Sequence, residues 1–239
     1  MRDCWGVVPA AGLGRRMGAD RPKQYLEIGG RTVLEHAIRR LASHPRVRGV
    51  TVCLAGNDPY WPALAPRLPA GVATAAGGPE RADSVFNGLE ALRGRCRPDD
   101  WVLVHDAARP CLRPGDVDAL IRAVEDWDGA GGLLALPMAD TVKRAGPDGA
   151  VLETVPREGL WRALTPQIFR FNILYQALEN ALKNALRVTD EASAVEAVGG
   201  RVRLVAGHPD NIKITHREDL ELARAILAAQ HPPGDGVGP

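Results

Sequence analysis

The feature that most constrains this chain is a regular alternation of short apolar runs with helical patterns along most of its length. We expect strands at residues 5–8, 50–54, 72–75, 101–104, 132–136, 202–205 and 212–215, and helices at 32–42, 82–92, 116–127, 172–186, 190–198 and 217–229. Thr32 with Glu35 forms a capping-box pattern at the first of these helix starts. The sequence therefore predicts an α/β fold in which a twisted, mainly parallel sheet is covered by helices on both faces.

One segment breaks this alternation. Residues 140–161 alternate polar and apolar side chains around Gly146-Pro147-Asp148-Gly149, which is a strong turn signal. We therefore predict a two-stranded hairpin here. A lone hairpin is marginally stable in water, so we expect it to pack on another surface, such as a second subunit.

The length and composition fit one domain. The chain has 239 residues and 45% hydrophobic residues, enough for a full core. We expect a single domain over residues 1–230 and a disordered tail at 231–239, where prolines and glycines dominate. Residues 57–70 hold four prolines and are expected to form a loop or a short helix.

Charge and cysteine content limit the partners. The 30 lysines and arginines balance 29 acidic residues, so we expect neither a nucleic-acid groove nor a membrane surface. No apolar run approaches the ~20 residues of a membrane span, and we expect no signal peptide before the first strand. Four cysteines lack metal-site or paired spacing, which favours reduced thiols in a cytoplasmic protein: Cys4, Cys53, Cys96 and Cys111.

The loop after the first strand predicts a nucleotide site. Residues 7–18 read VVPAAGLGRRMG, so an apolar strand opens into small residues, glycines and two arginines, with Lys23 close behind. Glycines let a ligand approach backbone N–H groups, and successive N–H groups bind anions. In an α/β sheet such a loop lies at the carboxyl edge, where ligands bind. Together with Arg15, Arg16 and Lys23, it favours a nucleoside triphosphate.

Two better-known glycine loops fit less well. Met17 occupies the position where a dinucleotide-binding loop needs Gly or Ala, and no acidic residue ends the second strand, where Leu54-Ala55-Gly56 stands. A P-loop would need Gly-Lys-Ser/Thr at its end, which Arg16-Met17-Gly18 does not provide. From glycine spacing alone, a basic surface turn remains an alternative.

Two further clusters carry candidate ligands. Gly77-Gly78 precedes a helix start with Ser84 nearby, and could hold a base or phosphate or be a plain helix N-terminus. Asp106 follows a buried strand, where its carboxylate is well placed to hold Mg²⁺ between triphosphate oxygens, or merely to cap a turn. Ala107 and Ala108 leave room for a sugar, and we interpret His105 as structural.

The remaining candidates are weaker when taken singly. Basic residues of the hairpin, at 143–144 and Arg157, are usually solvated on such elements. Residues 164–167 and 189–191 are both compatible with ordinary loop-to-helix capping. Lys213 lies in a predicted strand between apolar neighbours, and a lysine on a buried side needs an anion such as phosphate.

In combination, these motifs resemble one family. The glycine loop with Pro22-Lys23-Gln24-Tyr25, and the segments 80–84, 105–110, 164–167, 189–193 and 210–213, are similar to those of 2-C-methyl-D-erythritol 4-phosphate cytidylyltransferases of the non-mevalonate isoprenoid pathway. The likeness extends from Val7 to about Ala229. It implies a Rossmann-like domain of the nucleotide-diphospho-sugar transferase type, a homodimer joined by a projecting β-arm at about residues 138–160, and CMP transfer from CTP to methylerythritol phosphate with Mg²⁺.

The resemblance also implies residue roles. Nucleotide binding falls to Ala10, Ala11, Gly12, Gly14, Gly77, Gly78, Arg81, Ser84 and Asp106, of which Asp106 would also hold Mg²⁺. Binding of the acceptor substrate falls to Asp106, Ala107, Arg109, Thr141, Arg157, Thr165, Thr189 and Lys213. The catalytic residues would be Arg16, Lys23, Arg157 and Lys213. No side-chain nucleophile is required, because the attacking phosphate is already an anion.

Three alternatives stay open at this point. A cytidylyltransferase of the same fold could act on ribitol phosphate or another polyol or sugar phosphate. A nicotinamide-dependent oxidoreductase is disfavoured by Met17 and by the missing acidic ribose ligand. A non-catalytic nucleotide sensor would have no reason to keep Lys213 or Arg157.

Overall fold

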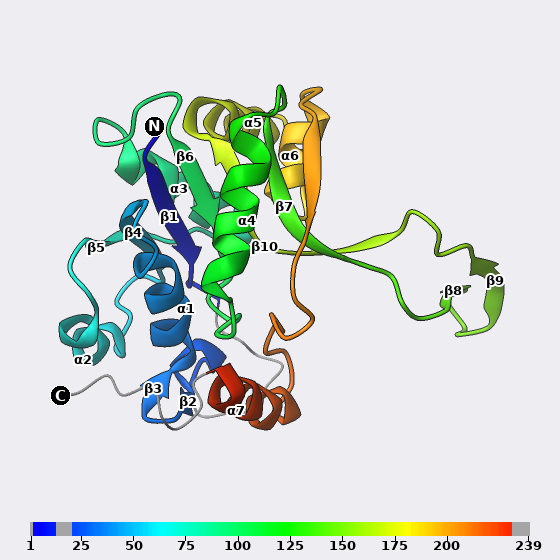
Figure 1. Cartoon of the computed structure of the whole chain (residues 1–239), viewed down its shortest axis with the longest axis horizontal. Coiled ribbons are helices and arrows are strands. Elements are labelled where there is room, and N and C mark those ends of the chain that lie inside the picture. The colour runs from blue at the N-terminus through cyan, green and yellow to red at the C-terminus, as the bar shows by residue number, and fades with distance from the viewer. Residues whose placement is uncertain (1, 13–20, 231–239) are drawn as a thin grey trace.

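The structure, a computed structural model, describes residues 2–12 and 21–230. The predicted Arg16 and Gly14 sites and the predicted disordered tail lie outside these residues. One sheet organises the molecule, in the strand order β11-β7-β10-β6-β1-β4-β5 (Figure 1). Its strands are β1 (Cys4–Pro9), β4 (Val47–Leu54), β5 (Val72–Ala76), β6 (Trp101–Val104), β7 (Gly131–Pro137), β10 (Trp161–Arg170) and β11 (Val202–Ala206).

The predicted parallel character of this sheet is confirmed. Strands β1, β4, β5 and β6 form a parallel block, and β11 runs parallel to β7. The exception is β10, which is antiparallel to both β6 and β7. No strand was predicted there, because residues 164–167 are equally compatible with a loop that caps a helix. In the structure Leu164 and Gln167 lie buried within the longest strand of the sheet.

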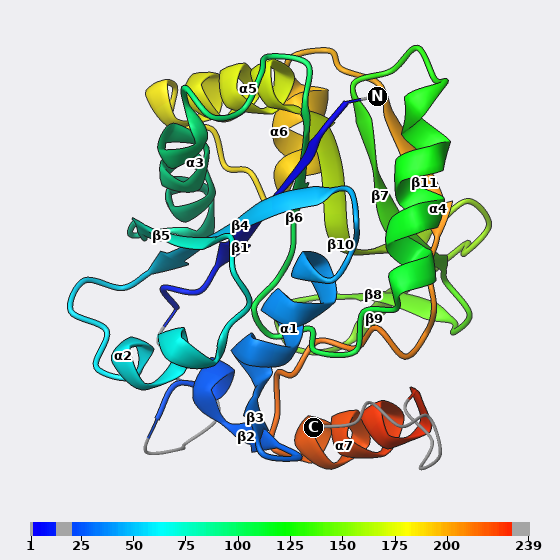
Figure 2. The ribbon, with the colours of Figure 1, turned by 60° about the vertical axis from the view of Figure 1, so that its left-hand side comes forward.

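Helices cover both faces of the sheet, as predicted (Figure 2). The apolar sides of α1 (Val33–Ala42) and α4 (Pro114–Glu125) pack into one buried cluster. The opposite cluster takes α3 (Arg81–Leu92), α5 (Phe171–Lys183) and α6 (Glu191–Ala197). Thr32 caps α1 by accepting a hydrogen bond from the Glu35 amide, as the sequence pattern indicated. Burying apolar helix faces on both sides of the sheet stabilises this layered arrangement.

A third buried cluster lies beside the carboxyl edge of the sheet. It joins α7 (Glu218–Gln230) to the short strand β2 (Glu27–Ile28), which pairs with β3 (Arg31–Thr32), through Ile28, Ala223 and Leu227. Ile214 is fully buried in the same cluster. Residues 212–215, however, form no strand, so that prediction is wrong: the segment pairs with α7 and loop atoms rather than with a sheet edge.

Smaller elements complete the fold. The proline-rich segment forms the short helices α2 (Trp61–Leu64) and η3 (Ala65–Arg67), and η2 (Lys23–Tyr25) follows the glycine loop. The segment predicted as a hairpin forms β8 (Val142–Ala145) and β9 (Val151–Val155), which pair antiparallel. The predicted turn is present: the Gly149 amide donates to the Gly146 carbonyl at 3.0 Å, and Gly149 adopts a φ of 83° that favours glycine.

This hairpin stands away from the sheet (Figure 1). We call residues 138–160 the arm. Val151 and Leu152 on β9 are 62% and 65% exposed, which is high for apolar side chains of this size. No helix in the part of the chain that the structure describes is both long and apolar enough to cross a membrane.

Candidate active site

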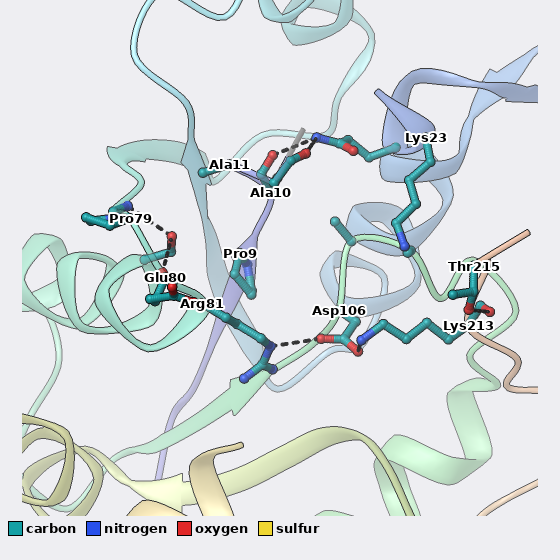
Figure 3. Close-up of a pocket in the computed structure, with 16 residues that line it drawn as sticks. Pro9, Ala10, Ala11, Lys23, Pro79, Glu80, Arg81, Asp106, Lys213 and Thr215 are labelled. Atoms are coloured by element: carbon teal, nitrogen blue, oxygen red, sulfur yellow. Dashed lines mark hydrogen bonds and ion pairs between the residues drawn. The ribbon is translucent and has the colours of Figure 1, made fainter. Parts of the chain in front are cut away.

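A pocket of about 420 Å³ lies at the carboxyl edge of the parallel strands, where the glycine loop was expected to place a ligand site. Two loops meet there because the strands before them, β1 and β6, are neighbours in the sheet. The Ala10 amide donates to the Cys53 carbonyl after β1, and the His105 amide donates to the Val7 carbonyl after β6. The N-terminus of α3 closes a further side (Figure 3).

Most of the predicted nucleotide residues line this pocket. The lining includes Ala10, Ala11, Gly12, Lys23, Gly78, Arg81, Ser84, Asp106, Ala107 and Lys213. The predicted residues Thr141 and Arg157 belong to the arm instead, and neither lines the pocket. Thr189 is exposed just before α6. The ligand-binding roles of all these residues stay predictions.

Asp106 is the centre of a charged cluster (Figure 3). Its Oδ1 accepts from Arg81 Nε at 3.1 Å, and its Oδ2 lies 2.9 Å from Lys213 Nζ and 3.5 Å from Arg109 Nε. Its carboxylate is only 9% exposed. Three cations around one carboxylate leave the pocket with an excess of positive charge, which suits a polyanionic ligand.

The surroundings of Asp106 fix its protonation. Burial alone raises the pKa of Asp106, but Arg81, Lys213 and Arg109 together lower it well below its ordinary value. Burial lowers the pKa of Arg109, a shift that Asp106 only partly offsets. For Arg81, the opposing attraction of Glu191 and Asp106 outweighs burial and raises the pKa. The cluster therefore keeps Asp106 ionised at any neutral pH.

Glu191 shares Arg81 with Asp106, a contact the sequence analysis missed. Its carboxylate is 1% exposed and accepts from both terminal nitrogens of Arg81, at 2.5 Å and 3.1 Å. Such a two-point contact orients the guanidinium firmly. Asp190, immediately before it, caps α6 by accepting from the Ser193 amide, as the sequence pattern allowed.

A buried polar network supports the Asp106 loop from behind. Thr165 Oγ1 accepts from the Asp106 amide at 3.0 Å and lies 3.0 Å from His105 Nδ1, while His105 Nε2 lies 3.0 Å from the Arg109 carbonyl. His105 is fully buried, and burial lowers its pKa to about 4. The imidazole is therefore neutral and structural, as interpreted from the sequence, and Thr165 holds the Asp106 backbone from strand β10.

The glycine pair before α3 differs from expectation in its detail. The Gly77 amide donates to the Leu54 carbonyl at 2.6 Å, and the Gly78 amide donates to Ser84 Oγ at 3.0 Å. A Cβ at either glycine would lie within 2.4 Å of a neighbouring side chain, Ala11 Cβ at 2.2 Å and Asp83 Cβ at 2.3 Å. Close packing therefore explains both glycines, and in this structure their N–H groups are engaged within the chain.

The segment 210–216, here called the strap, runs along another side of the pocket without helix or strand (Figure 3). Lys213 is exposed rather than buried, so its ion pair with Asp106 forms in the pocket and not in a strand interior. Lys23 Nζ donates to the Ile214 carbonyl on the strap at 2.8 Å. Arg109 Nη1 donates to the Asn211 carbonyl at 2.7 Å, which places Arg109 between strap and Asp106.

Gln24 is a second residue that the sequence analysis did not single out. Its buried Nε2 donates to the carbonyls of Ala10 and Gly12 at 2.8 Å and 2.9 Å. The side chain thereby ties the glycine loop to η2, which carries Lys23. The available signal was the position of Gln24 directly after Lys23.

This fold and pocket define a class of protein: an α/β nucleotidyltransferase with a Rossmann-like sheet and a cationic site at its carboxyl edge. The sequence model of the 2-C-methyl-D-erythritol 4-phosphate cytidylyltransferase family matches residues 5–229. The chain belongs to that family. The earlier resemblance is thus confirmed over nearly the whole chain.

Individual relatives carry the same name. The chain is similar to the 2-C-methyl-D-erythritol 4-phosphate cytidylyltransferase of Pseudomonas entomophila (strain L48), with 52% identity over 221 residues, 92% of this chain and 94% of the relative. It is similar to that of Pseudomonas aeruginosa (strain UCBPP-PA14), with 54% identity over 217 residues, 90% of this chain and 92% of the relative.

Solved structures agree with this assignment. A crystal structure of 4-diphosphocytidyl-2C-methyl-D-erythritol synthase superposes with a TM-score of 0.83 and 38% identity, covering 95% of this chain and 99% of the other. The Francisella tularensis 2-C-methyl-D-erythritol 4-phosphate cytidylyltransferase gives a TM-score of 0.81 and 33% identity, covering 94% and 99%. Both support the predicted fold.

Proposed function

We propose that this chain transfers CMP from CTP to 2-C-methyl-D-erythritol 4-phosphate, a step of isoprenoid biosynthesis. A phosphate oxygen of the acceptor attacks the α-phosphorus of CTP, the bond from that phosphorus to the bridging oxygen breaks, and pyrophosphate leaves. The products are 4-CDP-2-C-methyl-D-erythritol and pyrophosphate. Within the family shown above, the observation that carries this proposal is the cluster of Arg81, Arg109 and Lys213 around one ionised Asp106.

The catalytic problem in this reaction is repulsion between two anions. Fixed cations relieve it when they are held where charge develops, since they need not reorganise during the step. Lys23 would stabilise charge on the α-phosphate and the leaving pyrophosphate, and Arg16 would share that role. Lys213 and Arg109 would hold the acceptor phosphate for in-line attack, and holding both substrates in place supplies the rest of the acceleration.

We propose Mg²⁺ as the cofactor. Among the described residues, no three His, Cys, Asp or Glu side chains gather in a way that could hold a metal ion. Asp106 lines the pocket, so its carboxylate and triphosphate oxygens would be the ligands, the usual arrangement for Mg²⁺. When bound, the ion would neutralise charge on the phosphates.

The arm supports a homodimer as the working form. Its apolar β9 side chains are exposed, and a second copy would bury them in a twofold, self-complementary interface. Arg157 donates to the Ala139 carbonyl within the arm and does not line the pocket of its own subunit. We propose that Arg157 and Thr141 reach the acceptor in the partner subunit's site.

A reducing compartment fits the cysteines. Cys4, Cys53, Cys96 and Cys111 are all free and buried, and burial raises the pKa of each thiol to about 12. Such thiols are poor nucleophiles and act as small apolar side chains. We therefore propose that the protein works in the cytoplasm.

The test is turnover by the purified protein. With CTP, Mg²⁺ and methylerythritol phosphate we expect stoichiometric pyrophosphate and a phosphorus NMR signal from a new diphosphate ester. Ribitol phosphate and other polyol phosphates should be used far less well, and ATP should not replace CTP, because each buried polar group left unpaired by a wrong base costs ~1–3 kcal/mol. Equal turnover with ATP, or with ribitol phosphate, would overturn the proposal.

A further inference from the structure

The strap determines where two of the proposed phosphate-binding lysines lie. Lys213 and Thr215 line the pocket directly, and Lys23 is hydrogen-bonded to the strap through the Ile214 carbonyl at 2.8 Å. Because the Lys213 side chain is 43% exposed, packing does little to hold it. Its position depends on the course of the backbone and on its ion pair with Asp106.

An irregular segment lacks the repeating backbone hydrogen bonds of a helix or sheet, so contacts with other groups must hold it in place. On the side that faces the sheet, two hydrogen bonds hold the strap. The Ile214 amide donates to the Ala108 carbonyl at 2.9 Å, and Asn211 Nδ2 donates to the Thr165 carbonyl at 2.8 Å. These contacts anchor the middle and the start of the strap, but not its end.

Helix α7 provides the anchor at the end of the strap. Asp219, in its first turn, reaches back so that Oδ2 accepts from the Thr215 amide at 2.7 Å and from the His216 amide at 2.8 Å. This resembles the reciprocal arm of a capping box. The Ile214 side chain packs against Ala223 and Leu227 of the same helix. One carboxylate therefore joins the end of the strap to the C-terminal helix.

We infer that Asp219 is a positioning residue for the transfer reaction, an inference that rests on the proposed function. By fixing the amides of Thr215 and His216, Asp219 holds the strap in the course that directs Lys213 at the acceptor phosphate. Without this acceptor the end of the strap would turn its amides to water, and Lys213 would spend less time in the productive position.

Two substitutions at Asp219 and one control test this inference. Asp219→Ala removes the acceptor, whereas Asp219→Asn keeps an oxygen that can accept from the same amides. Thr32→Ala removes the cap of α1 and should cost similar thermal stability without touching the strap. We expect Asp219→Ala to raise the KM for methylerythritol phosphate about fivefold, the effect of one lost cap, and Asp219→Asn to restore it.

Amide hydrogen exchange gives a readout that needs no substrate. The amides of Thr215 and His216 should exchange faster in Asp219→Ala than in the wild type, Asp219→Asn or Thr32→Ala. An unchanged KM and unchanged exchange in Asp219→Ala would overturn the inference, as would an equal rise of KM in Thr32→Ala. If the wild type released no pyrophosphate, the proposed function would fail, and exchange would still decide whether Asp219 holds the strap.

Discussion

The pocket and the arm both carry ion pairs between arginines and carboxylates, but the pairs are buried in the pocket and exposed on the arm. In the pocket, Arg81 lies between Asp106 and Glu191, and both carboxylates are almost completely buried. On the arm, Arg144 pairs with Glu153 at 2.5 Å, but both side chains remain more than half exposed. The same chemical pair is therefore part of the folded interior in one region and a solvated contact in the other.

The difference follows from what surrounds each pair. The loops after β1 and β6 and the N-terminus of α3 meet around Asp106, so its ionic partners are fixed by the packing of the whole domain. The two strands of the arm have only each other within the described chain to pair with. A buried ion pair is costly to break from one side, whereas an exposed pair contributes little. The pocket therefore holds its ion pairs in the interior of one subunit, whereas the arm leaves its pair in contact with solvent.

The largest expected effect is on the free energy of unfolding, when one carboxylate of each region is replaced by the corresponding amide. Asp106→Asn removes the carboxylate that compensates Arg109 and Lys213, and should lower the free energy of unfolding by ~3–5 kcal/mol. Glu153→Gln on the arm should lower it by at most ~1 kcal/mol. Urea unfolding of both variants in one buffer measures the difference. Similar losses would mean that burial does not separate the two regions.

The next effect concerns catalysis at the pocket. Lys23→Ala should reduce kcat by ~10²–10³, with a smaller rise in the KM for methylerythritol phosphate, because a fixed cation acts on charge that develops in the transition state. Arg16→Ala should behave in the same way. Lys183→Ala, an exposed lysine of α5 paired with Glu179, is the control and should leave both constants unchanged. A change in KM alone would refute the transition-state role.

The third prediction concerns the pH dependence of stability that the buried His105 causes. His105 has a folded pKa of about 4 against 6.5 for a free histidine, so the unfolded chain takes up a proton that the folded chain does not. The free energy of unfolding that the neutral His105 contributes is fully present above pH 6.5. It falls by roughly 3 kcal/mol as the pH drops toward 4. His105→Gln should flatten the stability profile in this window, and urea unfolding at a series of pH values measures this.

The smallest expected effect tests the arm. Arg157→Ala should reduce kcat/KM for the acceptor by ~10–100-fold, as for one lost charge-assisted hydrogen bond, with CTP binding nearly intact. Mixing Lys23→Ala subunits with Arg157→Ala subunits makes the sharper experiment. If arms cross, each heterodimer has one site with both lesions and one intact site, and recovers about half of wild-type activity. If Arg157 served its own subunit, mixing would restore nothing.

The sequence by itself determined the layered α/β fold, the hairpin and the family. Strand and helix periods are local, so the boundaries of β6 were predicted to the residue and those of most helices to within a few. Motif order along the chain identified Asp106 and Lys213 as candidates and sufficed for the family. These inferences depend on neighbours in sequence, which the chain displays directly.

Only the tertiary structure decided which of those residues meet. β10 was missed because its pairing partners, β6 and β7, are distant in sequence and its local pattern fits a capped loop. Residues 212–215 were predicted as a strand because apolar residues alternate there. In the structure they pair with no strand of the sheet, and contacts with α7 hold them instead. Glu191 and Gln24 lie within motifs of the family resemblance, but the sequence does not show their partners, since a carboxylate or amide becomes a site residue only when folding brings it to an arginine or a loop carbonyl.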